Sequence, residues 1–181
     1  IIKSEDTTQT DYSKILKMFS NVDINNERIM PYYTNYCASI SNFISAAKNL
    51  YDKIIAFGFI PDTIPIMFNE DEIIDVGMSQ FVDMATRCIV SSDETIPLLS
   101  IEPPMISTTH HLDCVFSATE IFELARDVRY HIEKTNHVNN DISTKHGLVS
   151  FNWLIYIFAE YLSTKKQVVC KSTDLPSLHK I

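Results

Sequence analysis

Residues 148–162 read LVSFNWLIYIFAEYL, a segment in which Asn152 and Glu160 are the strongly polar side chains. A helix of this composition is apolar on nearly all of its sides, which is typical of a helix at the centre of a domain. The segment is also too short and too polar to cross a bilayer, so no membrane span is expected. It predicts a central helix over about 147–162, with Ser143 or Thr144 as the N-cap.

Amphipathic segments precede this helix along the chain. Apolar side chains recur at spacings of three and four residues, the spacing of one helix face, over 31–57, 70–90 and 108–134. Gly58 supplies a stop after the first segment, and the prolines of 91–106 favour an extended linker. A short helix is expected near residues 11–19. Because no convincing alternation of period two is found, the sequence predicts an all-α fold of about five to seven helices around the central one.

The length of the chain favours a single domain, because 181 residues are enough to bury one substantial core. Residues 1–10 are mostly polar and are expected to form a flexible N-terminal segment. The helical domain is expected to cover 11–162. Residues 163–181 mix charges, Ser, Thr and Pro without a period, which predicts a tail or a loosely docked segment.

Charge is strongly segregated along the chain. Between Ile54 and Ala125 there are twelve carboxylates and a single base, Arg87, whereas the net charge of the whole chain is -8. Clustered negative charge repels polyanions and steers basic partners toward a protein. The sequence therefore predicts an acidic protein-binding surface. The candidate residues are the acids Glu70, Asp71, Glu72, Asp75 and Asp83, with Tyr32 and Tyr36 as aromatic anchors.

Glycine and cysteine usage argue against the common cofactor sites. The chain has three isolated glycines, so no glycine-rich nucleotide cradle and no nucleophile elbow can be written from it. The four cysteines form no CxxC pair. His110 and Cys114 are the best metal candidates, one turn apart on a predicted helix, but a further ligand such as His137 or His146 would have to fold back onto them. The sequence therefore predicts neither a cofactor nor a metal.

These observations favour a non-enzymatic interaction domain whose partner is another protein with a basic or mixed surface. A pI near 5.1 disfavours nucleic acid. The absence of an N-x-Ser/Thr sequon and of a signal-peptide pattern at the start of the given sequence favours a reducing intracellular setting, in the cytoplasm or nucleus. The shortage of glycine and the abundance of Ile are typical of an AT-rich genome, such as those of several viruses.

Two alternatives stay open. One is a viral nucleocapsid-like or self-associating structural protein, because the acidic middle of the chain and its mildly basic flanks can pair between copies. This interpretation includes a homo-oligomer. The other is an enzyme of an unrecognised helical class, because any two of the 23 acids can meet in space and share acid–base chemistry.

Overall fold

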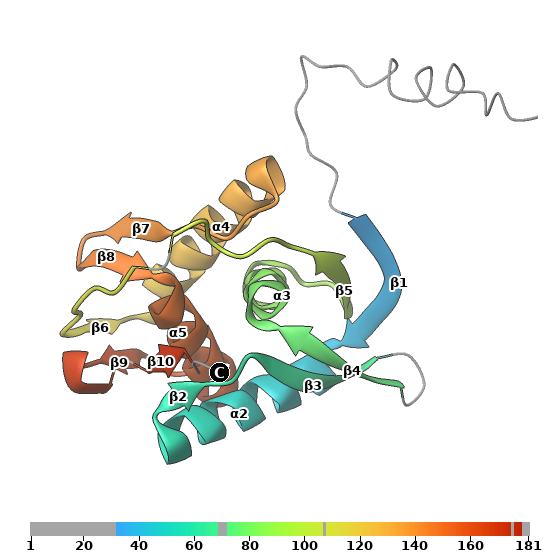
Figure 1. Ribbon diagram of the computed structural model, residues 1–181, viewed down its shortest axis with the longest axis horizontal. Helices are drawn as coiled ribbons and strands as arrows, with labels where there is room; N and C mark the ends of the chain where they lie inside the picture. The colour runs from blue at the N-terminus through green and yellow to red at the C-terminus, as the bar shows by residue number, and fades with distance from the viewer. Residues whose placement is uncertain (1–31, 69–71, 107, 175, 179–181) are drawn as a thin grey trace, which may run out of the picture.

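The computed structural model describes residues 32–68, 72–106, 108–174 and 176–178 (Figure 1). The described chain has a mixed α/β fold, so the all-α prediction is wrong. Four α-helices are present in these ranges: α2 (Ile40–Phe57), α3 (Met78–Val90), α4 (Ala118–Thr135) and α5 (Phe151–Thr164). A short 3-10 helix, η2, covers Ser172–Asp174.

Ten short strands accompany these helices in the described chain, and they pair two by two. The antiparallel pairs are β1 (Tyr32–Ser39) with β5 (Thr95–Ser100), β3 (Thr63–Phe68) with β4 (Glu72–Gly77), β6 (Cys114–Phe116) with β9 (Val168–Cys170), and β7 (Asp141–Thr144) with β8 (Gly147–Ser150). The parallel pair is β2 (Phe59–Ile60) with β10 (Ser177–Leu178).

Helix α5 lies at the centre of the molecule, as its composition predicted. Every residue from Phe151 to Ala159 is buried, and the helix packs against α2, α3 and α4. Two of its polar side chains bond to backbone carbonyls: Trp153 Nε1 donates to the carbonyl of His110 at 2.9 Å, and Asn152 Nδ2 donates to that of Pro176 at 3.0 Å. Among the described residues, no helix is long and apolar enough to cross a membrane.

The first predicted helix, 31–57, divides at Ser39 into strand β1 and helix α2. Ser39 is the N-cap of α2, and its hydroxyl accepts a hydrogen bond from the backbone N–H of Asn42 at 3.2 Å. The residues before it are rich in tyrosine, which favours a strand. Helix α2 ends at Gly58, which has a left-handed conformation with φ 72°, as predicted.

The second predicted helix, 70–90, is also half strand. Residues Glu72–Gly77 form β4, where Ile73, Ile74 and Val76 suit a strand, and α3 begins only at Met78. Glu72 therefore lies in a strand and not at the start of a helix. The predicted linker 91–106 contains β5, which pairs with β1.

The last two predicted helices begin later than expected. In 108–134, the first residues form an extended segment and β6, and α4 starts after the N-cap Ser117. Ser143 and Thr144 belong to β7 rather than to a helix cap. In the C-terminal segment, β9 pairs with β6 and β10 pairs with β2. The predicted helix at 11–19 lies outside the described residues.

Candidate functional site

The β3–β4 hairpin turns one apolar face to the core and another face to solvent. Strand β3 alternates exposed and buried side chains along all six of its residues. The strand register places Met67 beside Ile73 and Pro65 beside Asp75. Met67 and Ile73 expose 41% and 63% of their surface. We call the exposed face formed by Pro65, Met67, Ile73 and Asp75 the hairpin surface. Glu72 is also exposed, but it lies opposite the buried Phe68 in the register and therefore at the edge of the other face of the hairpin.

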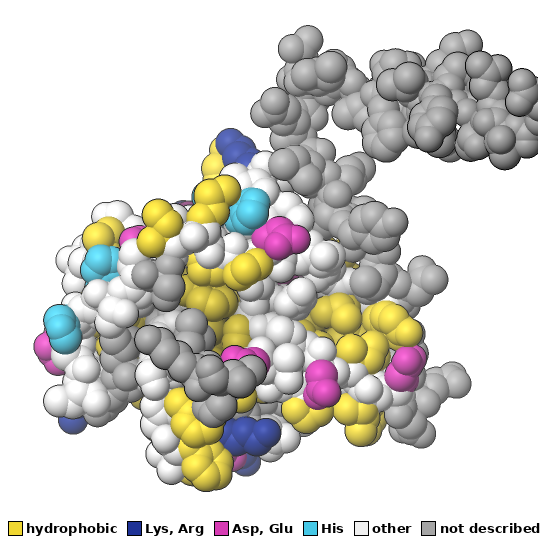
Figure 2. Space-filling model, viewed as in Figure 1, with side chains coloured by type: hydrophobic (Ala, Val, Ile, Leu, Met, Phe, Trp, Pro, Cys, Tyr) yellow, Lys and Arg dark blue, Asp and Glu magenta, His cyan; other side chains and the backbone are white. Residues whose placement is uncertain are grey.

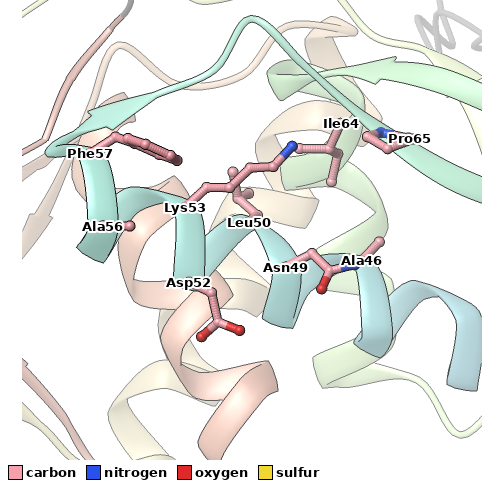
Figure 3. Close-up of a pocket in the computed structure, with 9 residues that line it drawn as sticks. All are labelled: Ala46, Asn49, Leu50, Asp52, Lys53, Ala56, Phe57, Ile64 and Pro65. Carbon is pink, nitrogen blue, oxygen red and sulfur yellow. The ribbon is translucent and has the colours of Figure 1, made fainter.

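A pocket of about 340 Å³ opens beside the hairpin surface, between α2 and β3 (Figure 3). Its lining residues are Ala46, Asn49, Leu50, Asp52, Lys53, Ala56, Phe57, Ile64 and Pro65. The Lys53 side chain extends across it toward Ile64, and the Asp52 carboxylate points away from β3. Pro65 belongs to both the pocket and the hairpin surface. The two features therefore form one continuous region of α2, β3 and β4.

Hydrophobic and acidic groups meet in this region. Phe57, which lines the pocket, exposes 66% of its surface at the end of α2. Figure 2 shows hydrophobic side chains gathered over β3 and β4, with acidic side chains among them. An exposed apolar group ringed by polar side chains is typical of a surface that binds another molecule.

Two of the acids singled out from the sequence lie in this region. Glu72 and Asp75 are both exposed on β4. The hydroxyl of Tyr36 donates to Glu72 Oε1 at 3.2 Å, and its ring meets Phe68 edge-on with the ring centroids 6.1 Å apart. Tyr36 thus links β1 to the hairpin, and its half-buried ring supports Glu72 from one side.

The other predicted residues do not join them. Glu70, Asp71 and the side chain of Tyr32 lie outside the described residues. Asp83 is fully buried on α3, where its carboxylate accepts hydrogen bonds from Arg87 Nε at 2.9 Å and Nη2 at 3.2 Å. Burial raises the pKa of Asp83, and the bonded Arg87 guanidinium opposes that shift. Asp83 therefore takes part in a buried ion pair and presents no charge to a partner.

The metal candidates are separated by the fold. His110 lies in an extended segment, where its Nε2 is 2.9 Å from Asp141 Oδ1 without hydrogen-bond geometry. Cys114 lies in β6, opposite Cys170 of β9. Within the described ranges, no group of three or more His, Cys, Asp or Glu side chains is arranged to hold a metal ion.

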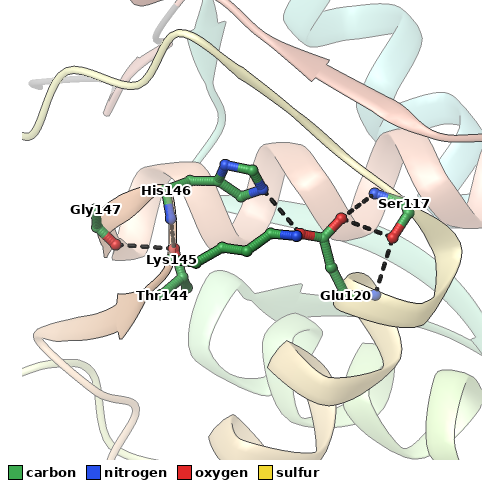
Figure 4. A network of polar contacts seen from close by, with 6 residues as sticks. All are labelled: Ser117, Glu120, Thr144, Lys145, His146 and Gly147. Carbon is green, nitrogen blue, oxygen red and sulfur yellow. Dashed lines mark hydrogen bonds and ion pairs between the residues drawn. The ribbon is translucent and has the colours of Figure 1, made fainter.

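A second polar cluster surrounds Glu120 at the start of α4 (Figure 4). Glu120 Oε1 lies 2.7 Å from Lys145 Nζ and 2.8 Å from His146 Nε2. Its other oxygen accepts hydrogen bonds from the backbone N–H and the hydroxyl of Ser117. These partners, the lysine above all, lower the pKa of Glu120 well below its usual range. The cluster is satisfied internally and ties α4 to the β7–β8 turn.

The fold also disperses the rest of the acidic segment. Asp113 accepts hydrogen bonds from the backbone and side chain of Ser172, which lower the pKa of Asp113. Asp83 and Glu120 are paired as described above. Asp83, Asp113 and Glu120 are therefore each held by partners within the fold, whereas Glu72 and Asp75 are the predicted binding acids that are exposed on β4.

The arrangement suits binding. The lining of the pocket between α2 and β3 contains one acid, one base and one amide beside its apolar side chains. It contains no Ser, Cys or His that a carboxylate could activate. It offers a recess for an apolar group and carboxylates for positive charge.

The apolar half of this region was not predicted from the sequence. Periodicity alone does not separate Met67, Ile73 and Phe57 from core-forming residues. The alternation of Ile64 and Ile66 was a usable signal for a strand with one exposed face, but the proline between them obscured it.

Comparison of the chain with protein-family models, with curated proteins and with solved structures finds no match.

Proposed function

We propose that this chain is a non-enzymatic domain that binds another protein through the hairpin surface and the adjoining α2–β3 pocket. The observation that carries the proposal is the continuity of the two features. The apolar recess meets the hairpin at Pro65, and on that face of the hairpin the exposed cross-strand pair Met67 and Ile73 lies beside the exposed Asp75. Glu72 adds a second exposed carboxylate at the edge of the same hairpin. Interfaces are commonly built from such an apolar centre with a polar rim.

Charge indicates the kind of partner. Residues 54–86 contain no Lys or Arg, whereas Glu72 and Asp75 are exposed within them. The base at the pocket itself is Lys53 of α2. The ligand that fits is a protein segment with one apolar side chain for the pocket and Lys or Arg residues for β4. Such charges raise the association rate more than they raise the final affinity.

An intracellular location is part of the proposal. It is supported by the lack of N-glycosylation sequons among the eleven Asn residues. Localisation of the tagged chain in its native cell tests this part separately from binding.

A peptide selection tests the binding proposal even though the natural partner is not identified. The full chain is screened against a display library of short random segments, and enriched peptides are synthesised and titrated. We expect them to share an aliphatic or aromatic residue flanked by Lys or Arg. The double variant Met67→Ser/Ile73→Ser should weaken their binding about tenfold or more, which corresponds to about 1.4 kcal/mol.

The matched control is Val115→Ser/Val169→Ser. These two valines also form an exposed cross-strand pair in a two-stranded antiparallel sheet, with 44% and 38% of their surfaces exposed. Equal losses in the two double variants would contradict the proposal, because the effect would then follow from any lost apolar pair. Enrichment of acidic peptides would contradict it as well.

A further inference from the structure

The β6–β9 sheet brings together two cysteines that are far apart in the sequence. Cys114 and Cys170 are directly opposite each other in the antiparallel register, and both are free thiols. Residues in this position have Cα atoms about 4.5 to 5.5 Å apart. Disulfides join Cα atoms about 4.4 to 6.8 Å apart. The strand pairing therefore places the two thiols within reach of a disulfide.

Contacts next to the pair hold this register. The backbone N–H of Ser172 donates to Asp113 Oδ1 at 3.0 Å, and its hydroxyl donates to Asp113 Oδ2 at 2.8 Å. Asp113 directly precedes Cys114, and Ser172 lies two residues after Cys170. On the other side, Phe116 pairs with Val168, and both are buried. The cysteines thus lie between two fixed points of the sheet.

The two thiols differ in their access to solvent. Cys170 is 1% exposed, whereas Cys114 is half-buried. Burial raises the pKa of both thiols. A reagent in solution therefore reaches Cys114 first, and Cys170 lies beside it to complete the reaction.

We infer that Cys114 and Cys170 form a redox-sensitive pair that a small-molecule disulfide, such as oxidised glutathione, converts into an intramolecular disulfide. The Cys114 thiol loses its proton and attacks one sulfur of the reagent, whose S–S bond breaks and releases one small thiol. Cys170 then loses its proton and attacks the Cys114 sulfur, which releases a second small thiol. Two protein thiols are oxidised, one reagent disulfide is reduced, and the two protons go to the released thiols.

The other two cysteines provide internal controls. Cys37 lies opposite Pro97 in the β1–β5 pair, and Cys88 lies on α3. Neither has a cysteine across from it in the described sheets. Replacing both with serine leaves the proposed pair as the only thiols in the chain.

The test is oxidation of the folded full-length variant Cys37→Ser/Cys88→Ser with oxidised glutathione, followed by alkylation and intact-mass analysis. We expect a monomer that has lost two hydrogens and takes up no alkylating reagent, with one crosslinked peptide pair that joins Cys114 to Cys170. With Cys170→Ala added, Cys114 should instead retain one glutathionyl group. With Cys114→Ala added, Cys170 should remain a free thiol while the protein is folded.

Two results would overturn the inference. One is alkylation of both thiols after treatment with oxidised glutathione at concentrations that oxidise the same chain in urea. The other is a product in which the disulfide joins two chains. The mass and alkylation of the Cys37→Ser/Cys88→Ser protein test the inference with Cys114 and Cys170 both in place. This result therefore stands even where Cys170→Ala fails to fold. The test is independent of the proposed binding surface.

Discussion

Asp83 and Arg87 form an ion pair in which one partner is fully buried and the other is 18% exposed. Removing one partner of a buried pair leaves an uncompensated charge, which costs about 3 to 5 kcal/mol. Their i, i+4 spacing was readable from the sequence. The burial was not, because it depends on how α4 and α5 pack against α3.

We predict that Arg87→Gln lowers the free energy of unfolding by about 3 kcal/mol. Replacing both partners, as Asp83→Asn/Arg87→Gln, should recover more than half of that loss, because no buried charge remains. Arg126→Gln is the control, since both partners of the Arg126–Asp127 contact are 60% exposed. Urea unfolding measures all three. A double variant no more stable than Arg87→Gln would show that the pair is not the cause.

At the scale of elements, strands replace parts of the helices that the sequence pattern predicted as continuous. Ser117 and Glu120 form a capping box, with mutual side-chain and backbone hydrogen bonds, at the start of α4. The Ser-x-x-Glu pattern was visible within the predicted helix 108–134, and it marks the true helix start. The pairing of β6 with β9 was not visible, because these strands are short and distant in sequence.

Glu120 also ties α4 to the β7–β8 turn, and this contact predicts a pH dependence. Its folded pKa lies below the unfolded value of about 4.3. The stabilisation is therefore present above that value and is lost as the pH falls below it. Glu120→Gln should show a smaller drop in unfolding free energy between pH 7 and pH 3 than the unmodified protein.

The exposed Glu123 on the same helix supplies the control, because Glu123→Gln should keep the original pH dependence. Urea unfolding at the two pH values measures both variants. If the unfolding free energy of Glu120→Gln fell between pH 7 and pH 3 by as much as that of the unmodified chain, the Glu120 contact would not be a source of the pH dependence.

At the scale of the whole molecule, composition was informative where one element was buried on all sides. The run of apolar residues in α5 indicated a central helix, and that helix is central. The sheets could not be read in this way, because each strand is short and most partners lie far away in the chain. Charge could not be read from the sequence for a related reason, because residues that are close in the sequence need not lie close together in the fold. The acids cluster along the sequence, but the fold places them on different elements, and Glu72 and Asp75 remain as the exposed pair on β4.

The most direct test of the binding surface is the association rate of a selected basic peptide, measured against ionic strength. The unmodified chain should bind more slowly as salt rises, and Glu72→Lys/Asp75→Lys should cut the rate at low salt by about tenfold. Glu123→Lys/Asp127→Lys makes the same charge change at exposed acids of α4 and should have a much smaller effect. Equal rates for the two double variants, or a rate indifferent to salt, would contradict an acidic binding surface on the β3–β4 hairpin.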